Sequence, residues 1–388
     1  MKRIYLDHNA TTPLRPEVLA AMMPYLTGEY GNASSIHAFG QNARGAVEQA
    51  RLQVARLIGA REAEIMFTSG GTESDNYAIL GAVAAAPGKT KHVITSAIEH
   101  VAALDPCRAL AKQGIELTIL PVDRNGLVSP EDVGGAIRPE TALVTIMLAN
   151  NEIGTIEPIA EIGKIAEEKG IVFHTDAVQA AGKVPIDVEK LGVDLLSISA
   201  HKFCGPKGVG ALYIRKGTRL EPLLYGGHSE RDRRPGTEDV AAIAGMGKAA
   251  ELALAEMGGE SERIRRLRDR LEQGLLERVP HAWVNSASAP RVPNTANLTF
   301  PFIEGESMVI ALDLKGIACS TGAACSSGAL EPSHVLLALG LAPEDARATL
   351  RLSLGHQTTS DEIDFALETI PPVIERLRRL SPTAYKIA

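Results

Sequence analysis

Short apolar runs alternate with longer amphipathic stretches between about residues 60 and 215 of the chain. The runs occupy residues 65–67, 92–95, 117–120, 143–147, 172–174, 195–198 and 210–214, and most of them are nearly continuous in apolar residues. Strands of a parallel sheet have such continuous apolar sequences, because crossover helices bury both faces of the sheet. The pattern predicts an α/β fold with a mostly parallel, seven-stranded sheet.

The second part of the chain has a different pattern. A Gly-rich, charged stretch, GGHSERDRRPGT at 226–237, predicts a hinge between domains, and two helical patterns follow at about 238–257 and 260–279. Strand candidates at 283–284, 296–300 and 350–354 then alternate with helices, which predicts a smaller α+β domain. We therefore expect an N-terminal segment (1–15) packing with the small domain, a large domain (16–257) and a small C-terminal domain (258–388).

Composition narrows the class of protein. With 45% apolar and 22% charged residues, and no apolar run long enough to span a membrane, the chain is typical of soluble globular proteins. A net charge of −7 argues against direct nucleic-acid binding, for which a basic surface is expected. The N-terminus lacks the apolar core of a secretory signal, so we expect a cytoplasmic protein that binds small molecules or protein partners.

Four cysteines, at positions 107, 204, 319 and 325, show neither a CxxC pair nor zinc-ligand spacing. Cys325 lies among Gly, Ala and Ser residues in a segment that predicts a mobile loop, where a thiol is a candidate nucleophile. With an ordinary pKa near about 8.5, such a thiol needs local activation at neutral pH. Cys319 is expected in the core, and Cys204 is expected to fill space beside Lys202.

Four polar positions follow predicted strands: Thr72 in TSGGTE, His100, Asp176 in FHTDAVQAAG and Lys202 in SAHKFCGPKGVG. Each alone has an ordinary explanation: a capping box, a structural histidine, a helix N-cap or a solvated lysine. Because the carboxyl ends of parallel strands share one edge of a sheet, we expect the four side chains to meet there.

Together these residue types suit pyridoxal 5'-phosphate. A lysine can form a Schiff base, and a carboxylate beside the pyridine nitrogen keeps that nitrogen protonated. Backbone N–H groups and hydroxyls at a helix N-terminus bind phosphate, and an imidazole can stack on the ring. The loop TSGGTE at 68–73 is neither a Walker motif nor a dinucleotide-binding fingerprint, since it lacks the glycine spacing of both motifs.

At this point the sequence resembles the cysteine desulfurases of iron–sulfur and nitrogenase cluster assembly, within the fold-type I pyridoxal-phosphate enzymes. The resemblance runs nearly end to end through YLDHNATTP (5–13), SGGTESDN (69–76), EH (99–100), NNEIGTIEPI (150–159), HTDAVQAAGK (174–183), SAHKFCGPKGVGALY (199–213), RRPGTEDV (233–240), STGAACSSGALEPSHVL (320–336) and RLSLG (351–355). The long loop with Cys325 in an ACSSG setting favours the cluster-assembly subgroup. Cys204 departs from the small or aromatic residue expected at its position.

The resemblance implies a role for each site residue. Lys202 anchors the cofactor, Asp176 pairs with the pyridine nitrogen, Gln179 faces the ring hydroxyl and His100 stacks on the ring. The phosphate is implied to be held by Gly71, Thr72, Ser199, His201 and, from the neighbouring subunit of a homodimer, Thr237. Asn151 contacts the cofactor and, with Arg351, the substrate carboxylate, which suits the guanidinium fork.

The implied reaction takes sulfur from L-cysteine, leaves L-alanine and holds the sulfur as a persulfide on Cys325, with Lys202 and His100 moving protons. An iron–sulfur scaffold or other acceptor protein then receives the sulfur. No dedicated metal site is expected, apart from transient ligation of a cluster through Cys325. The fold equally permits an aminotransferase or a selenocysteine lyase, and a docking protein without catalysis is a further alternative. The sequence leaves open which acceptor is used and whether tRNA thiolation is served.

Overall fold

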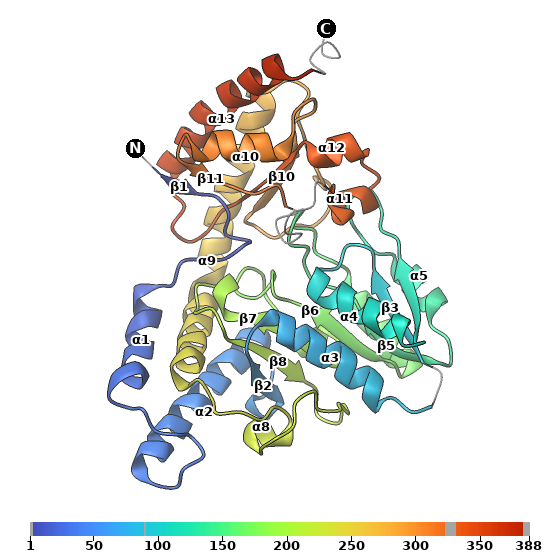
Figure 1. Ribbon diagram of the computed structural model, residues 1–388, viewed down its shortest axis with the longest axis vertical. Coiled ribbons are helices and arrows are strands. Elements are labelled where there is room, and N and C mark those ends of the chain that lie inside the picture. Colours follow the sequence, from blue (N-terminus) through green and yellow to red (C-terminus); the bar gives the residue numbers. More distant parts are fainter. Residues whose placement is uncertain (1–2, 89–90, 323–330, 383–388) are drawn as a thin grey trace.

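A computed structural model describes residues 3–88, 91–322 and 331–382, so Cys325 lies outside the described residues. The predicted α/β class is confirmed: a seven-stranded sheet has the order β2-β8-β7-β6-β5-β3-β4 and is parallel except for β8 (Figure 1). Its strands are β2 (Ile65–Thr68), β3 (His92–Ser96), β4 (Glu116–Leu120), β5 (Thr141–Thr145), β6 (Val172–Asp176), β7 (Leu195–Ser199) and β8 (Gly210–Ile214).

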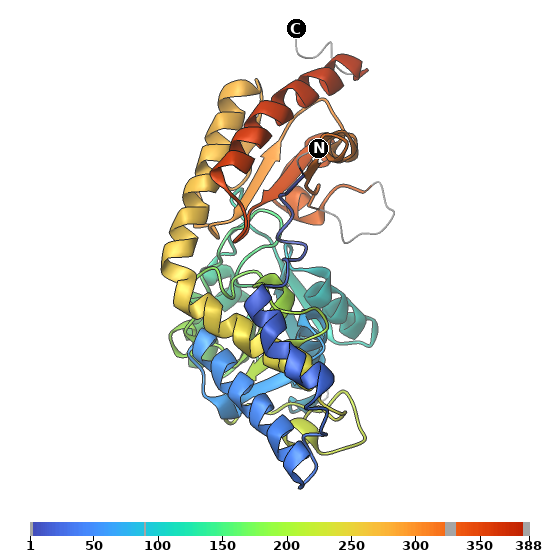
Figure 2. The ribbon, with the colours of Figure 1, turned by 90° about the vertical axis from the view of Figure 1, so that its left-hand side faces the viewer.

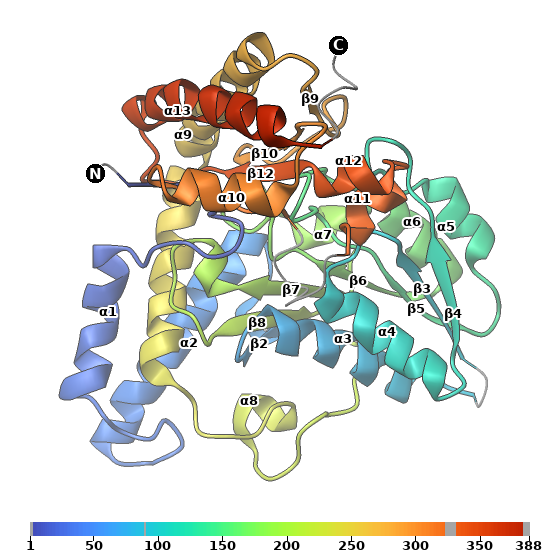
Figure 3. The same cartoon turned by 45° about the horizontal axis from the view of Figure 1, so that its top comes forward.

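Helices cover both faces of this sheet, which explains why its strands are apolar on both sides (Figure 3). One face packs on α3 (Gly71–Ala85) and α4 (Val101–Lys112), and the other on α2 (Ala38–Ile58), α6 (Ile159–Lys169) and the first part of α9 (Val240–Arg278). Neighbouring strand residues alternate between the two cores: Met66 joins the first, and Ile65 and Phe67 join the second. The remaining helices of this part are α1 (Pro16–Thr27), α5 (Pro130–Ala136), α7 (Val188–Leu191) and α8 (Ser229–Asp232), with short 3-10 turns η1 (Glu62–Glu64) and η2 (Ala200–Lys202).

A separate apolar core surrounds a second, antiparallel sheet of order β12-β10-β9. A parallel pair of β1 and β11 lies beside it, so the first strand of the chain joins the last part of the fold. The elements are β1 (Ile4–Tyr5), β9 (Trp283–Val284), β10 (Thr295–Thr299), α10 (Gly305–Asp313), β11 (Ile317–Ala318), α11 (His334–Ala338), α12 (Pro343–Arg347), β12 (Thr349–Ser353) and α13 (Ser360–Leu380).

One continuous helix, α9, connects the two cores, where the sequence predicted two helices (Figure 2). At about 1.5 Å per residue its 39 residues span about 58 Å. Gly258 and Gly259 suggested a break, but neither adopts a positive φ, and packing on both sides sustains the helix: Met257 lies in the first core and Ile264 in the second. The chain thus crosses between the two cores within α9, after the stretch 226–237 for which a hinge is predicted.

In the described part of the chain, no helix combines the length and the apolar character that crossing a bilayer requires.

Candidate active site

The predicted site residues gather at one edge of the large sheet. Strands β2, β3, β6 and β7 run parallel, so the segments that follow them emerge side by side. They carry Gly71 and Thr72 after β2, His100 after β3, Asp176 and Gln179 at and after β6, and Ser199, His201 and Lys202 at and after β7. The N-terminal segment and β12 approach the same edge from the second core.

Lys202 lies at the end of η2, close to the N-terminal segment. Its Nζ donates to the carbonyl oxygen of Ala10 at 2.9 Å and to that of Asn9. After burial, the charge of Lys202 is the next influence that lowers the pKa of His100, and it opposes the burial that raises the pKa of Asp176. The amine is thus held by carbonyl groups on one side and faces the other site residues.

Asp176 is the last residue of β6 and is buried. Burial raises the pKa of this carboxyl from 3.8 to about 6, while the N–H of Val178, at 2.8 Å from Oδ1, and the charge of Lys202 lower it. Two further acids lie behind it: burial raises the pKa of Glu99 to about 8 and raises that of Asp75 well above its ordinary value. A nearby positive charge stabilises the ionised form of such a buried carboxyl, and a protonated ring nitrogen can supply that charge.

His100 is the N-cap of α4, and its Nδ1 accepts the N–H of Ala102 at 3.1 Å. Burial, together with the charges of Lys202 and His334, lowers the pKa of His100 to about 4, so the ring is neutral at physiological pH. Because Nδ1 is the acceptor, the proton of the neutral ring lies on Nε2. His100 can therefore present one N–H group to a ligand.

The loop before α3 has the properties of a phosphate site. Gly70 has a φ of +152° and caps α3 without any side-chain hydrogen bond, which leaves the first N–H groups of the helix available. A Cβ on Gly71 would lie 2.8 Å from Cγ2 of Val178, so only glycine fits here. Thr72 is exposed at this end, and Ser199 is buried at the end of β7.

His201 and Thr237 have different surroundings. The Nδ1 of His201 lies 3.1 Å from Oγ1 of Thr11, and burial and nearby lysines lower the pKa of His201 to about 4. Thr237 is exposed in the segment between α8 and α9. In the same segment, Arg234 forms an ion pair with Glu73 at 2.8 Å, which ties this segment to the first turn of α3.

Asn151 and Arg351 join the two cores at the site. Arg351, on β12, pairs with Asp7 at 2.8 Å and donates to the carbonyl oxygen of Asn151 at 3.1 Å. Among the described residues, the buried Oδ1 of Asn151 and Nε of Arg351 have no hydrogen-bond partner. Buried polar atoms rarely remain unpaired, so both are available to a ligand.

The donor set therefore fits pyridoxal phosphate. The fit rests on a glycine-rich helix terminus without a side-chain cap, the buried carboxylate of Asp176, and the amine of Lys202, whose charge acts on that carboxylate.

Sequence reasoning missed Asn9, Lys183 and Glu152, although all three lie within motifs that carry the resemblance. The carbonyl of Asn9 accepts from Lys202, and Glu152 accepts the hydroxyl of Ser333 at 2.6 Å. A Cβ on Gly322 would lie 2.9 Å from the same carboxylate, so Glu152 lies close to residues before and after the segment with Cys325. A charged residue inside a motif of mainly apolar or small residues is the signal that could have found Lys183 and Glu152, whereas no signal marks the backbone carbonyl of Asn9.

Burial makes the described thiols unreactive. Burial raises the pKa of Cys107 and of Cys319 to about 12, and it also raises that of Cys204. The prediction that Cys319 belongs to the core is confirmed. Cys204 has a φ of +66°, an uncommon conformation for a residue with a side chain.

Known proteins share this fold and sequence. Residues 4–365 match the class-V aminotransferase family. The chain is 54% identical over 383 residues to the cysteine desulfurase IscS of Dictyoglomus turgidum, covering 98% of this chain and 97% of that protein. A solved NifS-like protein superposes with a TM-score of 0.90 at 37% identity, covering 97% of this chain and 100% of the other. SspA in complex with cysteine superposes with a TM-score of 0.82 at 38% identity, covering 90% and 98%. The chain belongs to the class-V aminotransferase family and, within it, to the cysteine desulfurases.

Proposed function

We propose that this protein transfers the sulfur of L-cysteine to Cys325 with the help of pyridoxal phosphate and releases L-alanine. The observation that carries the proposal is the convergence of Lys202, Asp176 and His100 beside an uncapped, glycine-rich helix terminus. Relatives named cysteine desulfurase support the reaction, and the solved relative SspA binds cysteine.

Enzymes of this family use pyridoxal phosphate, and each part of that cofactor has a counterpart here. Lys202 would hold its aldehyde carbon, Asp176 its ring nitrogen and Gln179 its ring hydroxyl, while His100 would stack on the ring. Its phosphate would be held by Gly71, Thr72, Ser199 and His201, and Asn151 would contact the ring. When bound, the cofactor supplies an electron sink for charge that develops at the substrate α-carbon.

The residues of the chain supply binding and proton transfer. Arg351 binds the substrate carboxylate with its guanidinium group, assisted by Asn151. Lys202 takes the α-proton of cysteine and returns protons to the product, and the neutral His100 donates from Nε2. Asp176 is buried and Lys202 is half-buried, so the cofactor ring would be largely enclosed on the side of Asp176.

The sulfur transfer uses Cys325 as the nucleophile. Its thiolate attacks the sulfur of the substrate, so that a sulfur–sulfur bond forms while the bond between carbon and sulfur breaks. The electron pair stays on the substrate carbon, which takes a proton and becomes the methyl group of alanine. No external oxidant or reductant is needed. The raised pKa of Cys107, Cys204 and Cys319 favours Cys325 as the acceptor.

A homodimer would complete the site: Thr237 lies exposed between α8 and α9, where a second copy of the chain could approach it. In this arrangement Thr237 of each subunit reaches the phosphate bound by the other. The persulfide sulfur would pass to an iron–sulfur scaffold or another acceptor protein.

The test is the visible absorption of the purified protein before and after L-cysteine and a thiol reductant are added, with alanine and sulfide measured together. We expect a cofactor band and equal yields of both products. Lys202→Ala should lose the band, and Cys325→Ser should keep the band but release almost no sulfide. Cys107→Ala is the matched control and should retain both the cofactor band and the release of sulfide. A cofactor band without alanine and sulfide would contradict the proposal and favour an aminotransferase.

A further inference from the structure

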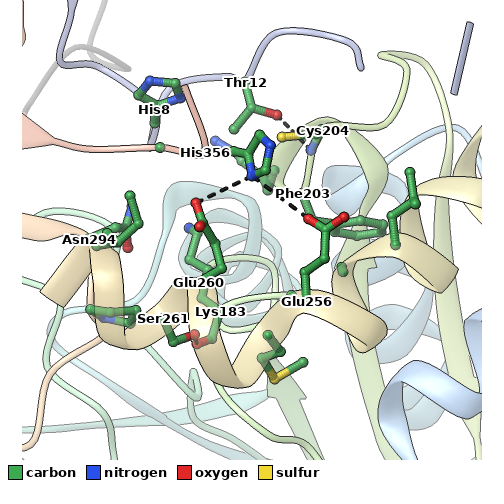
Figure 4. A pocket seen from close by; sticks show the side chains of 18 of the residues that line it. His8, Thr12, Lys183, Phe203, Cys204, Glu256, Glu260, Ser261, Asn294 and His356 are labelled. Carbon is green, nitrogen blue, oxygen red and sulfur yellow. Dashed lines mark hydrogen bonds and ion pairs between the residues drawn. The ribbon is translucent and has the colours of Figure 1, made fainter. Parts of the chain in front are cut away.

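Lys183 lies beside a cavity that has no assigned role (Figure 4). The cavity has a volume of about 100 Å³ and is also lined by Lys202, Cys204 and residues of α9. The side chain of Lys183 reaches back from this cavity toward the cofactor site. Its backbone is fixed, because Oγ of Ser261 on α9 donates to its carbonyl oxygen at 2.6 Å.

A chain of hydrogen bonds links Lys183 to the site. Its Nζ donates to Oε1 of Gln179 at 2.7 Å, and Nε2 of Gln179 donates to the carbonyl oxygen of Asn9 at 3.0 Å. The same carbonyl accepts from Nζ of Lys202. Lys183 and the proposed anchor lysine are therefore connected through one glutamine and one backbone group.

The surroundings of Lys183 make its amine easier to deprotonate than that of an ordinary lysine. In the part of the chain that the structure describes, no carboxylate lies within ion-pair distance of Lys183. Burial, and the charges of Lys202 and Arg351, lower the pKa of Lys183 to about 7. A neutral amine still donates hydrogen bonds, so the contact with Gln179 persists without a charge.

This contact fixes the orientation of the Gln179 amide. Its oxygen is occupied by Lys183, while its nitrogen uses one hydrogen for Asn9 and keeps a second. Without a donor at position 183, only the hydrogen bond to Asn9 would oppose a half-turn rotation of the amide, which places its oxygen where the nitrogen now lies. A ring hydroxyl that loses its proton would then face an acceptor in place of a donor.

We infer that Lys183 is a positioning residue: it holds the amide oxygen of Gln179 and thereby keeps the amide N–H directed at the ring hydroxyl of bound pyridoxal phosphate. The inference rests on the proposed function. It gives Lys183 a role in setting the electronic state of the cofactor, separate from the anchoring by Lys202.

The experiment is a pH titration of the visible absorption of the cofactor-loaded protein, without substrate. A donor to the ring oxygen stabilises its deprotonated form, so Lys183→Met should move the titration midpoint upward by about one pH unit. Lys183→Gln, which can still donate to Oε1, should stay near the wild type. Lys207→Met, at an exposed lysine after η2, is the matched control and should show no shift.

A double-mutant cycle separates an effect through Gln179 from a direct one. Gln179→Ala should shift the midpoint as Lys183→Met does, and the double variant should shift it no further. An unchanged midpoint in Lys183→Met, or shifts that add in the double variant, would overturn the inference. Should Lys183→Met not fold, a midpoint for Lys183→Gln equal to that of Gln179→Ala would overturn it as well. Absence of any cofactor band in the wild type would instead refute the proposed function.

Discussion

Asp176→Asn should stabilise the cofactor-free protein and weaken cofactor binding. The substitution removes a buried negative charge near Asp75 and Glu99 but keeps an oxygen that can accept the N–H of Val178. In the cofactor-free state the charge has no ring nitrogen to pair with, so its burial costs stability. In the loaded state the same charge stabilises the protonated ring.

The pKa of Asp176 gives the magnitude. It rises from an ordinary 3.8 to about 6 in the folded protein, so the folded state holds its proton more tightly than the unfolded state does. This destabilisation is absent below about pH 3.8, grows between about pH 3.8 and 6, and is constant above that range. At about 1.4 kcal/mol per pH unit, it amounts to about 3 kcal/mol at pH 8 and to about half of that at pH 5.

Urea unfolding of the cofactor-free protein tests this difference. The Asn variant should be more stable than the wild type at pH 8 by up to about 3 kcal/mol, and the gain should fall by about half at pH 5. Its dissociation constant for pyridoxal phosphate should rise at least about tenfold, since a charged pair is lost. Asp105→Asn, at an exposed acid on α4, is the control. A cofactor-free variant less stable than the wild type at pH 8 would refute the reasoning.

Three further substitutions test other parts of the structure. Gly71→Ala should weaken cofactor binding at least about tenfold in an equilibrium titration, because the added Cβ would collide with Val178. Gly45→Ala, where the added Cβ meets no neighbouring atom on α2, should leave the binding unchanged. Glu230→Ala should lower the free energy of unfolding by up to about 3–5 kcal/mol in urea, because it removes the buried partner of Arg51 and leaves only the more exposed Glu48, at 3.4 Å; an unchanged midpoint would contradict this. Arg351→Lys should raise the KM for cysteine at least about tenfold with a smaller change in kcat, since the variant loses the guanidinium fork. An unchanged KM would contradict the proposal that Arg351 binds the substrate carboxylate.

The strands of the large sheet were predictable because burial on both faces leaves a continuous apolar pattern. The site edge was predictable for the same reason: Thr72, His100, Asp176 and Lys202 each follow such a strand, and parallel strands end together. Helix α9 was misread because Gly258 and Gly259 weaken helix propensity locally, while the packing of the two halves on different cores overrides it.

The contacts that complete the site could not be predicted, because they join residues far apart in the chain. The charge of Lys183 stands out in the sequence, but its lowered pKa depends on burial and on the charges of Lys202 and Arg351, which only the fold brings near. The unpaired atoms of Asn151 and Arg351 likewise become apparent only when β12 packs against the large core. Sequence therefore predicts which residue types are present at the edge, whereas the fold determines which of them are paired.

The N-terminal segment shows how these distant contacts couple the two cores to one site. Leu6 is buried in the second core, and Asp7 pairs with Arg351, the proposed carboxylate-binding residue. Two residues later, the carbonyl of Asn9 accepts from Lys202, the proposed anchor of the cofactor. A shift of this segment would therefore move the substrate-binding and cofactor-binding groups together. The arrangement explains why a segment without any proposed catalytic side chain lies at the centre of the site, and why both cores must be folded for the site to form.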